Sequence, residues 1–216
     1  MKSLSLEHII QKPTTPSEDK TPLLLLLHGY GSNEEDLFSF APELPENYFI
    51  ISAKAPIEMQ PYGNAWYHIS IDPDGVKSSD NEGAKVARDM IATFINEAVK
   101  EYDLDPYNVT LLGFSQGTIL SYAVALTYPE KVKNVIGLSG YINEDIIDLK
   151  SNPSYTHLNI YNSHGTVDQV IPLEAAQKTP DYLEKVGIKS SLSTFPVGHG
   201  VHPTNFYEFK EWLLKL

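Results

Sequence analysis

The sequence predicts an α/β fold with a mostly parallel central sheet and helices on both of its faces. Short apolar runs of strand length alternate along the chain with longer segments of helical spacing, as in successive βαβ units. Residues 23–27 are leucine at every position, which indicates a strand buried on both faces. The 216 residues, 42% hydrophobic and 20% charged, suit one domain that spans residues 1–216.

The strands are expected where β-rich apolar runs lie between glycine, proline or polar residues. The first of them, residues 4–11, reads as an edge strand before a polar connection that carries Pro13 and Pro22. The others are expected at residues 23–27, 48–53, 108–114, 132–139, 158–163 and 190–195.

The helices are expected from apolar residues at helical spacing and from their end signals. Asn33 would cap a first helix with acidic residues in its opening turn. Pro180 should kink or break the helix that contains it. The longer helices are expected at residues 81–102, 116–128, 173–186 and 205–216, and residues 141–149 form a polar excursion with at most a short helix.

Residues 54–80 contain prolines, glycines and aromatic residues without a clear period. A loop of this length in a compact domain is usually a functional lid or wall. The other interpretation is a loop whose aromatic side chains fill a small core of its own.

The centre of the chain carries a chemical signal, Gly113-Phe114-Ser115-Gln116-Gly117, at the predicted junction of a strand and a helix. Glycines two residues to either side leave room for a sharp turn that holds Ser115 in a strained backbone with its hydroxyl exposed. The alternative is a tight turn that merely needs small residues. The position between a strand and a helix favours a nucleophile.

Polar groups follow other predicted strands in the same way: the turn after His28, Asp168 and His199. The carboxyl ends of parallel strands meet at one edge of a sheet, so these groups are expected near Ser115. A serine hydroxyl becomes a good nucleophile when an imidazole takes its proton, and a carboxylate fixes the tautomer of that imidazole.

Four motifs in this order resemble the phospholipase/carboxylesterase family of the α/β-hydrolase superfamily, which includes bacterial carboxylesterases and acyl-protein thioesterases. The resemblance covers residues 23–216, and its motifs are His28-Gly29-Tyr30-Gly31, Gly113 to Gly117, His164-Gly165-Thr166-Val167-Asp168-Gln169-Val170-Ile171-Pro172 and Gly198-His199-Gly200. It implies an α/β-hydrolase fold with Ser115 as nucleophile, Asp168 as orienting acid and His199 as base. It also implies the backbone N–H groups of Tyr30 and Gln116 as oxyanion donors, and Gln116 would stand at the positive end of a helix.

Other histidines offer competing assignments. His202, followed by Pro203, is an alternative base, although it suits a helix entry better. His164 is expected to hold the loop of Asp168, and His28 to brace the oxyanion turn. Asp72 and Asp74 in the long loop are expected to be solvated charges.

Trp66, Tyr67, Val170 and Ile171 are candidates for the wall of a substrate pocket, although packing explains them equally well. Asn64 stands where many relatives are expected to carry arginine, so a charged substrate contact is not expected there.

The predicted activity is hydrolysis of short-to-medium acyl carboxylic esters through an acyl-enzyme, without metal or organic cofactor. Thioesters and lysophospholipids remain alternatives, because only pocket shape separates these acyl groups. A catalytically silent fold used as a binding module is the alternative from another class.

The composition limits partners and location. Sixteen basic against 28 acidic residues give a net charge of −12, which disfavours nucleic acid and stable association with an anionic membrane. The absence of cysteine and of a signal-peptide pattern favours the cytoplasm. A small-molecule acyl ester is the expected partner, and the protein is expected to be a monomer or homodimer.

Overall fold

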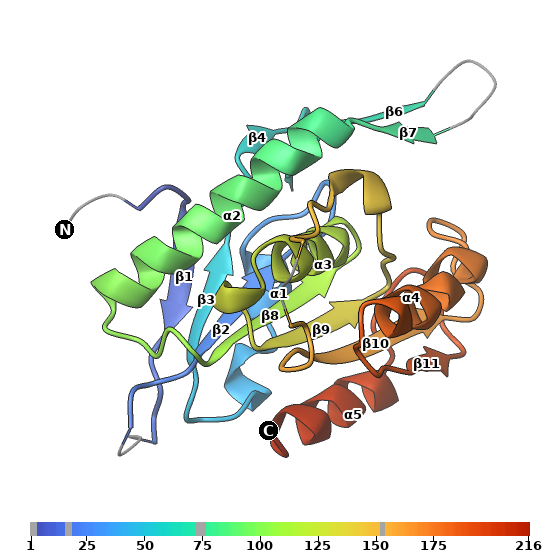
Figure 1. Ribbon diagram of the computed structural model, residues 1–216. Helices are drawn as coiled ribbons and strands as arrows, with labels where there is room; N and C mark the ends of the chain where they lie inside the picture. Colours follow the sequence, from blue (N-terminus) through green and yellow to red (C-terminus); the bar gives the residue numbers. More distant parts are fainter. Residues whose placement is uncertain (1–3, 16–18, 72–76, 152–153) are drawn as a thin grey trace.

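The computed structural model describes residues 4–15, 19–71, 77–151 and 154–216. Within these residues, the central sheet has seven strands in the order β1-β3-β2-β8-β9-β10-β11 (Figure 1). All neighbours are parallel except β1 and β3, so the prediction of a mostly parallel sheet is confirmed. The strands are β1 (His8–Gln11), β2 (Leu23–Leu27), β3 (Phe49–Ala53), β8 (Val109–Phe114), β9 (Asn134–Leu138), β10 (Asn159–Gly165) and β11 (Leu192–Phe195).

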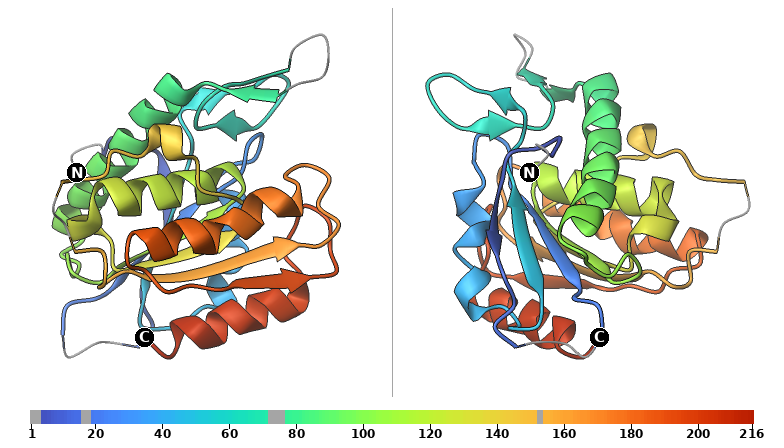
Figure 2. Two further views of the ribbon diagram at one scale, coloured as in Figure 1. Left: turned by 45° about the vertical axis from the view of Figure 1, so that its right-hand side comes forward. Right: turned by 90° about the vertical axis from the view of Figure 1, so that its left-hand side faces the viewer.

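Helices cover both faces of this sheet (Figure 2). One face carries α2 (Asn81–Glu101), α3 (Gln116–Thr127) and α4 (Leu173–Lys185), and the other carries α1 (Glu35–Phe38) and α5 (Pro203–Leu213). Alternate leucines of β2 enter the two cores: Leu23, Leu25 and Leu27 pack into one, and Leu24 and Leu26 into the other. This is why the run is apolar without interruption.

Polar side chains bond the first turns of two helices, but of these side chains only Asp80 stands at an N-cap. The N-cap residue of α1 is Glu34, not the predicted Asn33, and its side chain makes no cap hydrogen bond among the described residues. The Asp80 side chain accepts a hydrogen bond from the Gly83 N–H at 2.9 Å before α2. Asn33 Oδ1 accepts one from the Glu35 N–H at 2.9 Å, so Asn33 does bond the start of α1. The polar excursion after β9 contains a short 3-10 turn, Glu144–Ile146.

The structure corrects the expectation of an irregular loop over residues 54–80. The segment contains two small hairpins, β4 (Ile57–Glu58) with β5 (Asn64–Ala65), and β6 (Ile69–Ile71) with β7 (Lys77–Ser79). Their strands are too short to give a period that the sequence could reveal. The predicted solvated charges Asp72 and Asp74 lie outside the described residues.

Pro180 does not break α4, which runs from Leu173 to Lys185 as one helix. Proline removes one N–H donor, but the helix keeps Ala176, Thr179 and Leu183 buried along one side. That packing holds the helix together across the proline. The predicted first strand is also shorter than expected, because β1 begins at His8.

Within the described ranges, no helix combines the length and the apolar character that crossing a bilayer requires.

Candidate active site

Ser115 stands between β8 and α3, in a backbone conformation that residues with a side chain rarely adopt. Its φ of 54° and ψ of −115° place it outside the ordinary helical and extended regions. A Cβ on Gly117 would lie 1.9 Å from the Leu27 carbonyl oxygen, and one on Gly113 would lie 2.5 Å from Gly117 backbone atoms. The glycines of the motif are therefore required by close backbone contacts, and the turn that they permit presents the Ser115 hydroxyl.

The structure brings the three predicted side chains into one hydrogen-bonded chain. His199 Nε2 lies 2.9 Å from Ser115 Oγ, and His199 Nδ1 lies 2.7 Å from Asp168 Oδ2. An ionised Asp168 can only accept a hydrogen bond, so the proton of His199 is held on Nδ1. The lone pair on Nε2 then faces the serine hydroxyl.

Asp168 is held as a carboxylate. Burial alone would raise the pKa of Asp168, but hydrogen bonds from His199 and from the N–H groups of Ile171 and Val170 together lower it below its usual value. Both N–H groups donate to Oδ1, at 3.0 Å and 2.8 Å. The other oxygen, Oδ2, remains for His199.

The ends of β10 and β11 bring His199 to this position. A Cβ on Gly165 would lie 2.2 Å from the Gly198 carbonyl oxygen, so the loop of His199 rests directly against the end of β10. The His199 ring also packs on Phe114, with ring centroids 5.0 Å apart. The residue before the serine thus helps to orient the imidazole.

The turn after β2 lies against the serine. A Cβ on Gly29 would come within 3.4 Å of Ser115 Cβ. In the part of the chain that the structure describes, no hydrogen-bond acceptor is found for the N–H of Tyr30 or of Gln116. Gln116 begins α3, where the helix dipole adds positive potential. The N–H groups of Tyr30 and Gln116 can therefore both donate hydrogen bonds to an anionic oxygen.

The hairpin of β4 and β5 fixes that turn. The Gly31 N–H donates to the Asn64 carbonyl at 2.8 Å, and the Asn64 N–H donates to the Ser32 carbonyl at 2.7 Å. The Asn64 side chain is buried and donates to the Ala55 carbonyl at 3.0 Å. Asn64 therefore has a structural role that sequence reasoning missed, since its backbone partners, Gly31 and Ser32, lie in a distant segment of the chain.

His28 braces the same turn in a single protonation state. Its Nδ1 lies 2.8 Å from the Gly29 carbonyl oxygen, and its Nε2 accepts from the Ala55 N–H at 3.1 Å. This pairing requires a proton on Nδ1 and a lone pair on Nε2. Burial, offset in part by the bond to Gly29, lowers the pKa of His28 below its ordinary value.

We expect His28 to make the protein less stable in mild acid. Because the pKa is lower in the folded state, the unfolded state binds more protons below about pH 6.5, and the free energy of unfolding falls as the pH drops. The His28→Asn variant should be less stable at pH 7.5, with a slope between pH 6.5 and 5 that is shallower by up to about 1.4 kcal/mol per pH unit. Urea denaturation across this range measures both slopes, and equal slopes would contradict the assignment.

A cavity of about 640 Å³ opens beside Ser115 and His199. None of its lining residues, all of which the structure describes, is aspartate, glutamate, lysine or arginine. The cavity therefore favours a neutral, largely apolar group. The lining residues are Tyr30, Tyr67, Ile69, Ser79, Ser115, Gln116, Ile119, Tyr141, Val170, Ile171, Pro172, Ala175 and His199.

Three of the four candidate pocket residues, Tyr67, Val170 and Ile171, line this cavity. Trp66 does not: it is buried, and its Nε1 donates to the His28 carbonyl at 3.0 Å. The packing alternative was correct for Trp66, because its indole N–H finds a partner in the turn rather than in the pocket.

The Gln116 side chain joins the serine turn to the cavity wall, a role that its motif did not reveal. Its Oε1 accepts from the Trp66 N–H at 2.9 Å, and its Nε2 donates to the Tyr67 carbonyl at 2.8 Å. Ile69, Ser79, Ile119 and Tyr141 are further lining residues that the sequence did not single out. They come from elements far apart in the chain.

The remaining histidines have other partners. His202 Nδ1 accepts from the Thr204 N–H at 3.2 Å at the start of α5, and its ring stacks on Phe195, so it is not placed as a base. His164 Nε2 bonds the Ile171 carbonyl at 2.9 Å, across the loop of Asp168, as expected. Among the described residues, no group of three or more His, Cys, Asp or Glu side chains could hold a metal ion.

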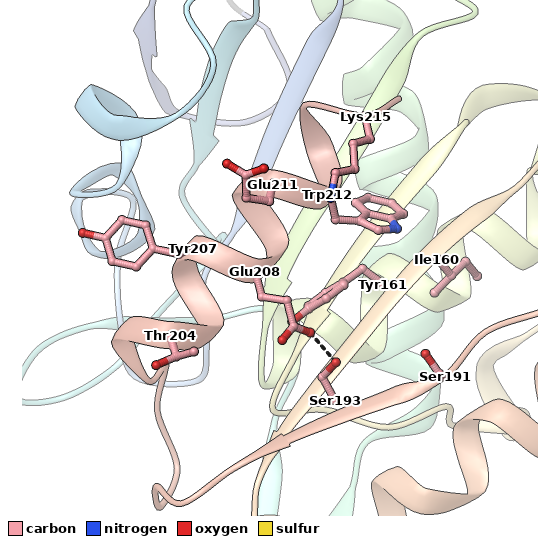
Figure 3. Close-up of a pocket in the computed structure, with 10 residues that line it drawn as sticks. All are labelled: Ile160, Tyr161, Ser191, Ser193, Thr204, Tyr207, Glu208, Glu211, Trp212 and Lys215. Carbon is pink, nitrogen blue, oxygen red and sulfur yellow. Dashed lines mark hydrogen bonds between the residues drawn. The ribbon is translucent and has the colours of Figure 1, made fainter.

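A separate groove of about 550 Å³ lies between α5 and the edge of the sheet at β10 and β11 (Figure 3). There Glu208 bonds Ser193 and, at 3.0 Å, the Tyr161 hydroxyl. None of the predicted site residues lines it, so it is distinct from the cavity at Ser115. Its lining residues are Ile160, Tyr161, Ser191, Ser193, Thr204, Tyr207, Glu208, Glu211, Trp212 and Lys215.

The sheet order and the serine at a strand–helix turn define an α/β-hydrolase fold. The sequence model of the phospholipase/carboxylesterase family matches residues 9–216. The chain therefore belongs to the phospholipase/carboxylesterase family, and it is a serine hydrolase of carboxylic esters.

Curated relatives agree with this membership, and solved structures share the fold. The chain is 27% identical over 203 residues to a probable carboxylesterase of Oryza sativa, covering 88% of this chain and 76% of that protein. It is 26% identical over 178 residues to acyl-protein thioesterase 1 of Kluyveromyces lactis, covering 76% of each. The solved carboxylesterase of Bacillus cereus has a TM-score of 0.83 at 21% identity, covering 97% of this chain and 94% of that one. The solved carboxylesterase of Mesorhizobium loti has a TM-score of 0.83 at 20% identity, covering 100% of this chain and 98% of that one.

Proposed function

We propose that the protein hydrolyses carboxylic esters of short-to-medium, apolar acyl groups through an acyl-enzyme on Ser115. The observation that carries the proposal is the hydrogen-bonded chain of Ser115, His199 and Asp168 at an uncharged cavity. Ser115 Oγ attacks the ester carbonyl while His199 Nε2 takes its proton. Asp168 holds the other imidazole proton and stabilises the imidazolium that forms.

The oxyanion of the tetrahedral intermediate accepts hydrogen bonds from the N–H groups of Tyr30 and Gln116. The intermediate collapses, the bond to the alcohol breaks, and His199 returns its proton to the leaving oxygen. A water molecule then gives a proton to His199 and attacks the acyl-enzyme, and the second collapse releases the acid and restores Ser115.

Thioester hydrolysis is a second candidate, favoured by the similarity to an acyl-protein thioesterase. The same nucleophile and donors serve both acyl groups. Paired esters and thioesters with the same acyl chain distinguish the two by their values of kcat/KM.

The proposal is tested by the intact mass of the protein after a short incubation with a fluorophosphonate. We expect one adduct, which is absent in Ser115→Ala and retained in Ser79→Ala, a variant of another serine that lines the cavity. With p-nitrophenyl esters from acetate to palmitate, each added methylene should raise kcat/KM by about fourfold until the cavity is full. A folded protein with neither adduct nor hydrolysis would indicate a binding module instead.

A further inference from the structure

His164 lies behind the Asp168 carboxylate and is buried, with 1% of its surface exposed. Its Nε2 is 2.9 Å from the Ile171 carbonyl oxygen and 3.3 Å from Asp168 Oδ2. Both neighbours are hydrogen-bond acceptors, so Nε2 must carry a proton; it donates this proton to the Ile171 carbonyl, and the Asp168 oxygen lies beside the N–H without a hydrogen bond to it.

The other ring nitrogen, Nδ1, is buried and has no hydrogen-bond partner among the described residues. A second proton, on Nδ1, would be a buried donor without an acceptor. Such an unsatisfied N–H costs more free energy than the unpaired lone pair of a neutral ring. His164 is therefore neutral, in the single tautomer that donates from Nε2.

Asp168 Oδ2 thus faces two imidazoles. His199 Nδ1 approaches it at 2.7 Å and His164 Nε2 at 3.3 Å, while Oδ1 is occupied by the N–H groups of Val170 and Ile171. In the described ranges, these two histidines are the only titratable side chains that contact the carboxylate.

We propose that His164 is a positioning residue of the reaction, whose neutral, polar N–H lies beside Asp168 Oδ2 and so limits how strongly the carboxylate stabilises the imidazolium of His199. This inference rests on the proposed function of Ser115, His199 and Asp168. The positive end of a polar N–H beside a carboxylate stabilises its negative charge without a formal hydrogen bond. Removing the His164 N–H therefore favours the protonated form of His199. Neutral His199, which acts as the base, then becomes protonated at a higher pH.

The test compares His164→Leu, which removes the donor, with His164→Gln, whose amide nitrogen can replace Nε2. In His164→Leu, the acid limb of the kcat/KM profile should move to higher pH by about half a unit, because a polar N–H is removed from beside the carboxylate. KM should change by less than about twofold, because His164 does not line the cavity. In His164→Gln, the acid limb of the kcat/KM profile should lie at the same pH as in the wild type.

A second measurement needs no turnover. The imidazole N–H proton that His199 shares with Asp168 can be followed by proton NMR as the pH is lowered. The pH at which its signal changes should move in His164→Leu in the same direction and by the same amount as the acid limb of kcat/KM. His164→Met replaces His164→Leu if the latter does not fold.

The outcomes separate the two levels of the proposal. A lower stability or kcat in His164→Leu, with an unmoved acid limb and an unmoved NMR transition, would overturn the inference and leave His164 as a support for Ile171. If the wild-type protein formed no fluorophosphonate adduct, the proposed function would be overturned. The NMR measurement would still show whether His164 affects the protonation of His199.

Discussion

Ser115→Ala is expected to lower kcat by about 10⁶-fold while the protein stays folded. The variant removes the oxygen that is proposed to form the acyl-enzyme, and it leaves the cavity and the N–H donors in place. Its stability should change little, because the Ser115 hydroxyl has only the bond to His199 within the described residues. Initial rates with a p-nitrophenyl ester of medium chain length, together with urea denaturation, measure both effects.

The Ser79→Ala variant is the matched control, since Ser79 lines the same cavity away from the proposed nucleophile. It should still form the fluorophosphonate adduct and turn over the ester, because the proposed nucleophile is intact. Turnover by Ser115→Ala near the rate of the wild type would reject the assignment of the nucleophile.

Asp168→Asn is expected to lower kcat by about 10⁴-fold. Both N–H groups of Val170 and Ile171 donate to Oδ1, so the amide oxygen of asparagine must take that place. Its NH₂ group then faces His199 Nδ1, which has to become an acceptor. The proton of His199 then moves to Nε2, the atom whose lone pair deprotonates Ser115 in the proposed mechanism.

Asp145→Asn is the control for a lost negative charge, because Asp145 is exposed and bonds Asn81 instead of a histidine. It should retain kcat within about twofold of the wild type. Comparable losses in the two variants would contradict the tautomer argument and indicate a general electrostatic effect.

The sheet and the hydrogen-bonded set of Ser115, His199 and Asp168 could be predicted from the sequence, because each depends on a local pattern. The leucine run marks a strand buried on both faces, and glycines flank Ser115 where the backbone has no room for side chains. Parallel strands then bring the residues at their carboxyl ends to one edge. Order along the chain and strand position were enough to predict that these groups lie together.

The walls of the site, apart from Tyr67, Val170 and Ile171, could not be predicted in the same way, because they depend on contacts between distant segments. The hairpin of β4 and β5 is fixed by the pairing of Asn64 with Ser32, and Trp66 is held by the carbonyl of His28. The continuity of α4 through Pro180 likewise depends on packing beneath the helix. Local propensity carries no information about such partners.

The segment over residues 54–80 has two parts with different tolerance to mutation. Residues 64–67 are tied to the turn of Tyr30 and to the Gln116 side chain, so substitutions there would disturb catalysis together with substrate fit. Among the described strands, β6 and β7 pair only with each other, and their hairpin projects from the body of the protein (Figure 1). Ile69 and Ser79 of this hairpin reach the cavity. A library for changing the proposed acyl-chain selectivity would therefore start with these two positions, where new side chains reshape the cavity and leave the proposed oxyanion donors in place.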